Sequence, residues 1–168
     1  PQNYNQGTEE DRILGSQHGL NWILEGYPGS GNLIIFNNLS NWIGNESQVI
    51  EISTPLNDYN TYDLNVDGSY GPESWIWSYS GNISTPIQGG VFRLPNGNTL
   101  ITITHNAELL EVNPNGDIVW DFTFDFNEIN HWIARAQKYP IDYLIPEFTL
   151  GDVNNDELIN ILDVVSIV

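Results

Sequence analysis

One run of four short segments occurs twice in this chain, in the same order. The aligned pairs are Gln17–Ile23 with Gln88–Leu94, Gly31–Phe36 with Gly97–Thr102, Ser47–Ile52 with Ala107–Val112, and Ser74–Tyr79 with Asp117–Phe122. The last pair superposes Trp77 on Trp120. All these segments are short and rich in apolar residues, and turns such as "PNGN" and "NPNG" separate them, which predicts β-strands.

Four strands in a repeat of roughly 40–50 residues are typical of a β-propeller blade. A third copy begins at Ile133–Pro140, which parallels "GVFRLP" and places Lys138 at the position of Arg93. We therefore predict an all-β fold with two blades of four antiparallel strands and the start of a third. A closed propeller needs about 4–8 blades, so further blades or other chains would complete the ring. A sandwich of eight similar strands is the alternative.

The first repeat carries an insertion, Leu56–Glu73, that the second repeat lacks. Within it, Asp63, Asn65 and Asp67 alternate carboxylate, amide and carboxylate before a glycine. This alternation is one possible calcium loop. A hairpin tip with an Asp-Gly turn explains the same residues at least as well, because Ser74 stands at loop position twelve.

The charge balance excludes one class of partner. In 168 residues, 22 Asp and Glu stand against four Lys and Arg, which gives a net charge of -18. Nucleic-acid binding needs cations against phosphate, so we expect no nucleic-acid partner. No apolar run reaches the ~18–20 residues of a membrane span. The chain begins at Pro1, and we expect a processed product, an excerpt or the ordered part of a longer protein.

Taken in order, "SQHGLNWILEGYPGSGNLIIFNN", "GGVFRLPNGNTLITITHNAELLEVNPNGDIVWDF" and "WIARAQKYPIDYL" resemble the C-terminal half of the arylsulfotransferase family. The similarity spans about Asp11–Leu144. The resemblance implies a secreted, periplasmic or cell-surface β-propeller protein. It also implies an enzyme that moves sulfate from an aryl sulfate to a phenol without a nucleotide donor, through a histidine that becomes sulfated.

The resemblance places three residues in the catalytic site. His18 starts the innermost strand of the first repeat, where the family has "QH". His105 follows the second strand of the second repeat and is a candidate nucleophile or sulfate ligand. Arg135, in the third copy, could hold an anion, with a salt bridge to a carboxylate as the alternative. We expect a structural role for His131.

A non-catalytic propeller is the second hypothesis. The stretch Leu39–Gln48 holds no basic residue, whereas catalytic members usually carry one there. A strongly negative protein also repels aryl sulfates unless its channel is locally positive. Such a propeller would be a structural or binding subunit of an extracellular assembly, since a fold alone does not determine function.

The C-terminal stretch "GDVNNDELINILDVV" resembles one calcium-binding repeat of a type I dockerin. The spacing of oxygen ligands around Ca²⁺ assigns the loop to Asp152, Asn154, Asp156, Leu158 through its carbonyl, Asn160 and Asp163. An EF-hand-like loop and a short helix should follow from this pattern. Glu157 stands where the loop usually has Gly.

The chain thus divides into a partial propeller at 1–144, a linker at 145–150 and a partial dockerin-like repeat at 151–168. Calcium is the expected cofactor. The dockerin-like segment is a possible contact for a protein partner.

Overall fold

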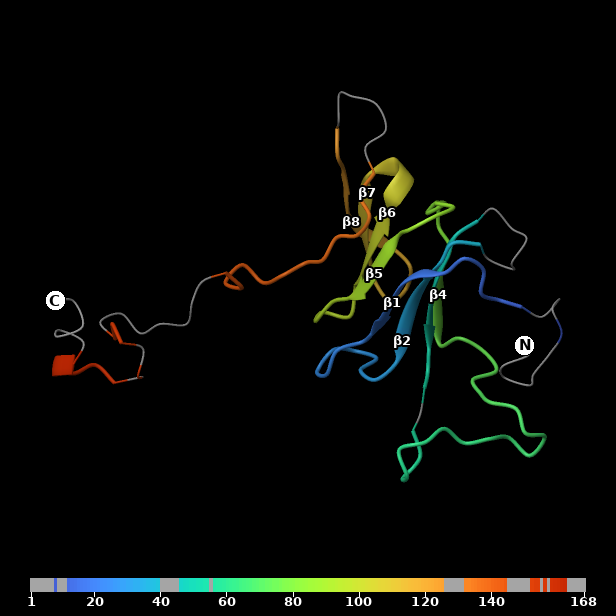
Figure 1. Ribbon diagram of the computed structural model, residues 1–168. Coiled ribbons are helices and arrows are strands. Elements are labelled where there is room, and N and C mark those ends of the chain that lie inside the picture. Colours follow the sequence, from blue (N-terminus) through green and yellow to red (C-terminus); the bar gives the residue numbers. More distant parts are fainter. Residues whose placement is uncertain are drawn as a thin grey trace. The chain divides into compact units, whose positions relative to one another are not determined.

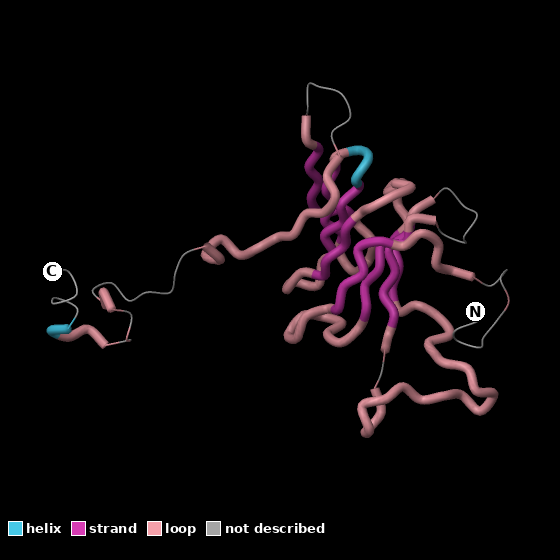
Figure 2. The backbone as a smooth tube through the Cα atoms, in the orientation of Figure 1, coloured by secondary structure: helices cyan, strands magenta, loops and turns pink. Residues whose placement is uncertain are grey.

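The computed structural model describes residues 8, 12–39, 46–54, 56–125, 132–144, 152–154, 156 and 158–162. It divides into two compact units, 1–137 and 138–168. The first unit contains two four-stranded antiparallel sheets (Figures 1 and 2). The first sheet consists of β1 (His18–Trp22), β2 (Leu33–Asn37), β3 (Gln48–Ile52) and β4 (Trp77–Tyr79). The second consists of β5 (Gly90–Arg93), β6 (Thr99–Ile103), β7 (Glu108–Val112) and β8 (Ile118–Thr123).

The register of the strands confirms the repeat. In the first sheet Glu51 on β3 pairs with Trp77 on β4, and in the second Glu111 on β7 pairs with Trp120 on β8. Both sheets follow the chain order, strand next to strand. The predicted all-β fold of four-stranded antiparallel units is therefore confirmed.

The main hydrophobic core joins the two sheets. Its buried members are Ile23, Ile34, Phe36, Val49, Ile83, Val91, Ile101, Ile103, Leu110 and Val112. Alternate residues of β6 and β7 divide between two faces, because successive side chains of a strand point to opposite sides. Ile101 and Leu110 belong to the core between the sheets, whereas Leu100 and Leu109 form a separate cluster.

Phe36 lies at a close approach between the two sheets. Its side chain is fully buried, and Gly89 lies against the ring. A Cβ atom at Gly89 would lie 2.7 Å from Cδ1 of Phe36, and the φ of Gly89 is +104°. Only glycine combines this backbone with this clearance, so Gly89 allows the connection into β5 to pass over β2.

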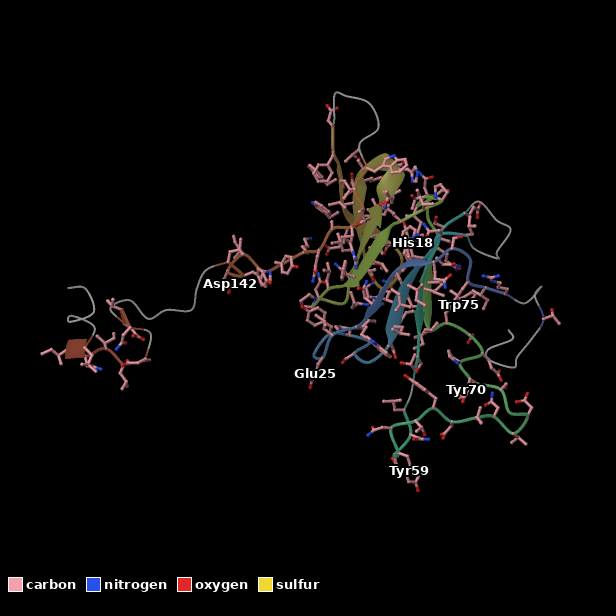
Figure 3. The ribbon with its side chains drawn as sticks, viewed as in Figure 1. His18, Glu25, Tyr59, Tyr70, Trp75 and Asp142 are labelled. Atoms are coloured by element: carbon pink, nitrogen blue, oxygen red, sulfur yellow. The ribbon has the colours of Figure 1, made fainter. Side chains whose placement is uncertain are left out.

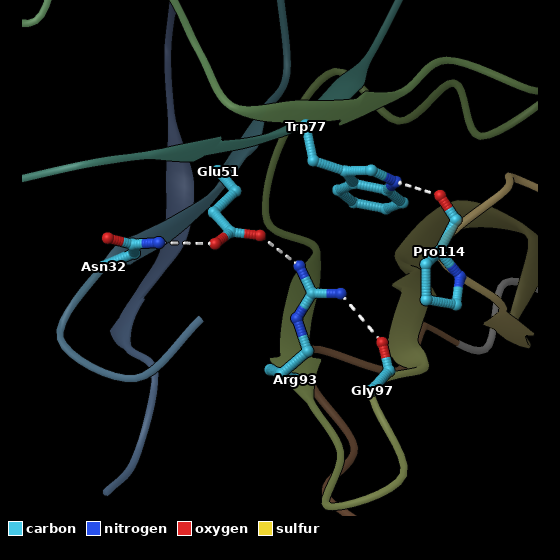
Figure 4. A network of polar contacts seen from close by, with 6 residues as sticks. All are labelled: Asn32, Glu51, Trp77, Arg93, Gly97 and Pro114. Atoms are coloured by element: carbon cyan, nitrogen blue, oxygen red, sulfur yellow. Dashed lines mark hydrogen bonds and ion pairs between the residues drawn. The ribbon is translucent and has the colours of Figure 1, made fainter. Parts of the chain in front are cut away.

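A buried ion pair links the sheets at one end. Arg93 on β5 donates from Nη2 to Glu51 on β3, and from Nη1 to the carbonyl of Gly97 at 2.9 Å (Figure 4). Asn32 donates to the other oxygen of Glu51 at 2.7 Å. The guanidinium carbon lies 5.1 Å from the centroid of the Trp77 ring, within cation–π range.

Desolvation is the largest electrostatic effect on this guanidinium. Burial lowers the pKa of Arg93, and the charge and hydrogen bond of Glu51 partly offset that change. The pKa of an Arg starts so high that the group stays charged at any ordinary pH. The charge therefore remains inside the protein and depends on Glu51.

The predicted start of a third blade takes a different form. Residues 132–140 form no strand. The first part of this segment nevertheless lies on the second sheet: the N–H of Ala136 donates to Oγ1 of Thr102 at 3.0 Å, and Ala136 packs on the Leu94, Leu100 and Leu109 cluster.

The insertion leaves the first sheet at the end of β3 and returns at β4 (Figure 1). It contains a small hairpin in which Leu64 bridges Tyr70, and the N–H of Asn65 donates to the carbonyl of Ser69. Tyr59 projects from it, away from the sheets (Figure 3). Tyr59 is 86% exposed.

The second unit, 138–168, is described only in part. The ring centroids of Tyr139 and Tyr143 lie 4.2 Å apart across a turn. Residues 161 and 162 have helical conformation. The proposed linker 145–150 lies outside the described residues.

We predict that Glu51→Gln destabilises the protein by about 3–5 kcal/mol, because it leaves the buried charge of Arg93 without its counter-ion. Urea unfolding would measure the change. The double variant Glu51→Gln/Arg93→Met should recover much of the loss, since replacing both charges by uncharged groups is often neutral. Glu25→Gln, at an exposed position, is the matched control. Equal losses in the single and the double variant would contradict the prediction.

Candidate functional site

His18 and His105 lie at the same end of the two sheets. His18 begins β1 and faces Phe36 near the end of β2, while His105 sits in the 3-10 turn Thr104–Asn106 between β6 and β7. The Glu51–Arg93 pair lies at the opposite end, beside the turns after β1 and β5. The fold thus brings two predicted catalytic residues to one place although they come from different repeats.

The ring of His18 is held in one tautomer. Its Nδ1 lies 2.8 Å from the carbonyl oxygen of Ser16 and 2.8 Å from Oδ1 of Asn38. Both partners are acceptors, since the Nδ2 of Asn38 donates to the carbonyls of Thr85 and Gln88. Nδ1 must therefore carry the proton, which leaves the lone pair of the neutral ring on Nε2.

His105 has the same arrangement. Its Nδ1 lies 2.5 Å from Oγ1 of Thr85, and that hydroxyl donates to the carbonyl of Ile87 at 3.0 Å. Because the hydroxyl proton is used there, Oγ1 accepts from Nδ1–H, and Nε2 again holds the lone pair. The Trp132 ring lies against the imidazole, with 4.4 Å between centroids.

A buried polar network connects the two imidazoles. Asn38 and Thr85 are fully buried, and Ser47 is 3% exposed. The Ser47 hydroxyl accepts from the N–H of Thr85 at 3.0 Å and lies 3.1 Å from the carbonyls of Asn38 and Thr85. Buried polar groups that are satisfied in this way form a rigid unit.

Three non-glycine residues with strained backbone conformations lie at the end of the sheets that carries the two histidines. Ser16, Gln88 and Ala107 have φ values of 49°, 59° and 50°, although none is a glycine. Ser16 and Gln88 present their carbonyls to His18 and Asn38, and Ala107 ends the turn that carries His105. Such conformations cost on the order of 1–3 kcal/mol each and cluster at functional sites.

This arrangement can supply two nucleophilic or basic nitrogens. A neutral imidazole with its Nδ1–H bound to an acceptor has a free lone pair at Nε2 and tolerates positive charge when Nε2 forms a bond. The described contacts of the two rings include no cation. Charge on a sulfuryl group would therefore need donors from elsewhere.

Arg135 stands apart from this network. Its guanidinium carbon lies 5.9 Å from the centroid of Phe92, and its side chain passes over Gly90, on the face of the second sheet that carries Leu100. No hydrogen bond in the described part of the chain joins it to either histidine. His131 lies outside the described residues.

The two calcium candidates form hydrogen-bonded loops. In the insertion, Asp67 accepts from the N–H and hydroxyl of Ser69, which lowers the pKa of Asp67, and Asp63 accepts from Asn57. These bonds are those of a hairpin tip. Across the described residues, no cluster of three or more His, Cys, Asp or Glu side chains could hold a metal ion.

In the C-terminal loop, the N–H of Asp156 lies within 3.1 Å of Oδ1 of Asp152, and Asp156 accepts from the N–H of Leu158 at 3.0 Å. Asn154 donates to Asp156, and Asn160 caps the N–H of Leu162. The loop therefore folds around its own carboxylates. Asp163, the sixth predicted ligand, lies outside the described residues.

Sequence reasoning missed the residues that orient the histidines. Asn38, Ser47 and Thr85 are uncharged polar residues, a type that is common throughout this chain. Asn38 stands within "FNN", a stretch already assigned to the family pattern, and this is the one signal that pointed to it. Thr85 lies in the connection between the repeats and carried no signal.

Comparison with known families gives a match over much of the chain. The model of the family described as Arylsulfotransferase (ASST) matches residues 9–125, which include His18 and His105 and end before Arg135. No curated protein matches the chain. Within the described residues, no helix combines the length and the apolar character that crossing a membrane requires.

We predict that Ser47→Ala destabilises the protein by about 1–3 kcal/mol, because it leaves the buried N–H of Thr85 without an acceptor. Thr54→Ala is the matched control: Thr54 is only half-buried, and its hydroxyl donates to the carbonyl of Gly31 at 3.1 Å in a solvent-exposed hydrogen bond. Unfolding in urea would compare the two variants. A loss no larger than that of the control would show that the network contributes little.

Proposed function

The chain belongs to the arylsulfotransferase family, and from this premise we propose that it transfers a sulfuryl group from an aryl sulfate to a phenol through His18. One observation carries the proposal. The Nδ1 of His18 is bound to two acceptors, so the ring presents the lone pair of Nε2. This is the protonation state that a nucleophilic imidazole requires.

In the first half-reaction, Nε2 of His18 attacks the sulfur of the aryl sulfate. The S–O bond to the aryl group breaks, and the phenolate leaves with the electron pair and takes up a proton. The sulfated ring is positively charged, and its Nδ1–H remains bound to Ser16 and Asn38. These two acceptors stabilise the charge that develops on the ring.

In the second half-reaction, the acceptor phenol gives up its proton and its oxygen attacks the sulfur. The S–N bond breaks, and its electron pair returns to Nε2. The lone pair on Nε2 of His105 suits this imidazole to accept the proton of the phenol. We also propose that Arg135 binds the sulfuryl oxygens: it has no described hydrogen bond to either histidine, but its side chain passes over Gly90 at the start of β5, the end of the sheet at which His105 lies.

The proposal includes the architecture around the site. We propose that the two sheets are consecutive propeller blades. Their identical strand order and their matched Glu–Trp pairs support this assignment. The outer face of the second sheet also exposes Trp120, Phe122 and Phe124, whose rings contact one another. A following blade would cover such a face.

The second candidate is a non-catalytic propeller in an extracellular assembly. The net charge of -18 and the lack of basic residues in Leu39–Gln48 favour it, because an aryl sulfate is an anion. Under both proposals the protein is secreted, periplasmic or on the cell surface. Catalysis distinguishes the two.

The decisive test follows phenolate release from a chromogenic aryl sulfate, with phenol as the acceptor. We expect transfer by the full chain, and a decrease of at least about 10³-fold in kcat for His18→Gln. Without acceptor, mass spectrometry should find the sulfuryl group on the His18 peptide. Thr54→Ala is the control. Absence of transfer by the wild-type chain would favour the non-catalytic propeller.

We also propose that the C-terminal loop binds Ca²⁺ through Asp152, Asn154, Asp156, Leu158, Asn160 and Asp163, as one half of a dockerin-like module. The alternating oxygen side chains support this, because Ca²⁺ takes six to eight oxygen ligands. A protein partner is proposed to contact this segment.

Calcium titration monitored by the amide signals of residues 152–162 tests this proposal. We expect these signals to shift saturably with Ca²⁺ and to return when a chelator is added. Asp156→Ala should abolish the shift, because it removes a ligand and the acceptor of the Leu158 N–H. Asp142→Ala serves as the control, outside the loop. A titration without shifts would exclude a calcium site there.

A further inference from the structure

The amide of Asn38 contacts both halves of the candidate site. Its oxygen accepts from Nδ1–H of His18 at 2.8 Å, and its nitrogen donates to the carbonyls of Thr85 at 2.8 Å and Gln88 at 2.6 Å. Those two residues bound the short connection into β5. Thr85 in turn accepts from His105. One buried side chain therefore links both imidazoles.

We propose that Asn38 is a positioning residue of this site: together with the carbonyl of Ser16, its amide sets the tautomer and orientation of His18 and, through the 85–88 connection, it also orients His105. The inference rests on the proposed function for its catalytic meaning. The inference also predicts which ring nitrogen of each histidine carries the proton, and this can be measured whether or not the protein is an active enzyme.

The physical reason is the fixed polarity of an amide. Two carbonyls at the nitrogen of Asn38 prevent the amide from turning over, because a reversed amide would place an acceptor against both carbonyls. The oxygen is thereby directed at His18, and Nδ1 must be the protonated nitrogen.

The amide of Asn38 accepts from His18 and donates to the carbonyls of Thr85 and Gln88. Two substitutions at Asn38 and two at Thr85 separate the effects of these contacts on the two histidines. Asn38→Ala removes both kinds of contact. Asn38→Asp keeps an acceptor for His18 and loses the donor to Thr85 and Gln88. Thr85→Val removes the acceptor for His105 alone, and Thr85→Ser retains it.

Asn37→Ala is the matched control. Asn37 is the neighbouring residue, equally buried, and its amide also bonds to backbone, at Ile13 and Gly15. The described contacts of its side chain include neither histidine. Any effect of simple destabilisation should therefore occur in this variant too.

The experiment is long-range ¹H–¹⁵N NMR of the histidine rings in the full chain, with each ring assigned by a single His→Gln substitution. The spectra are recorded at a pH at which the imidazoles are neutral, and in the wild type we expect Nδ1 to carry the proton in both rings. Asn38→Ala leaves the carbonyl of Ser16 as an acceptor for His18, so we expect a larger share of the Nε2-protonated tautomer in both rings rather than its complete dominance. Asn38→Asp should keep the proton on Nδ1 of His18 and disturb the tautomer of His105, and Thr85→Val should disturb His105 only. Thr85→Ser and Asn37→Ala should match the wild type.

The activity assay adds an independent readout. If the chain is a sulfotransferase, Asn38→Ala should lower kcat about 10- to 100-fold with little change in KM, as for other orienting partners of histidine. Ring signals that do not change in Asn38→Ala would overturn the inference, whatever the activity. If Asn38→Ala does not fold, unchanged His105 signals in both Asn38→Asp and Thr85→Val would overturn it equally. Changed ring signals in a chain without transfer would uphold the inference and reject the proposed function.

Discussion

The buried pair of Glu51 and Arg93 determines how the two sheets of this protein face each other. A guanidinium inside an apolar interface is tolerated only where its counter-ion and acceptors are in place. Glu51, the carbonyl of Gly97 and the ring of Trp77 supply them at a single alignment of β3 with β5. A shift of one sheet along the other would leave two charges buried and unmatched. The apolar core provides the attraction between the sheets, and this pair selects the alignment.

That alignment determines the geometry at the opposite end. There the contacts between sheets are neutral: Asn38 with Thr85 and Gln88, and Phe36 with Gly89. Neutral amides and hydroxyls are suitable where an imidazole must stay uncharged, since a carboxylate at Asn38 would favour the protonated ring. The two ends therefore differ in chemistry for a physical reason. One end holds a permanent charge, and the other surrounds two imidazoles with uncharged partners.

The sequence predicted most of the fold and part of the site. The repeat located all eight strands and matched Trp77 with Trp120, because strand pairing follows from local pattern and order. It also placed His18 and His105 in the site, on the family resemblance. It did not predict Asn38 or Thr85 as their partners, since each of those contacts joins residues 20 positions apart in the sequence. Residues 133–140 resemble a strand by alignment, but a strand also requires pairing with another strand, and in the structure this segment instead contacts the second sheet through Ala136.

The long insertion leaves the first sheet at the end where Ile52 and Trp77 lie, far along the strands from His18. Loops are the parts of a domain that accept changes in length most readily. At this edge, a lineage can extend or replace the β3–β4 connection without disturbing the network around the imidazoles. The sequence of the insertion, including its hairpin around the Leu64–Tyr70 bridge, can therefore change in evolution independently of the histidine network.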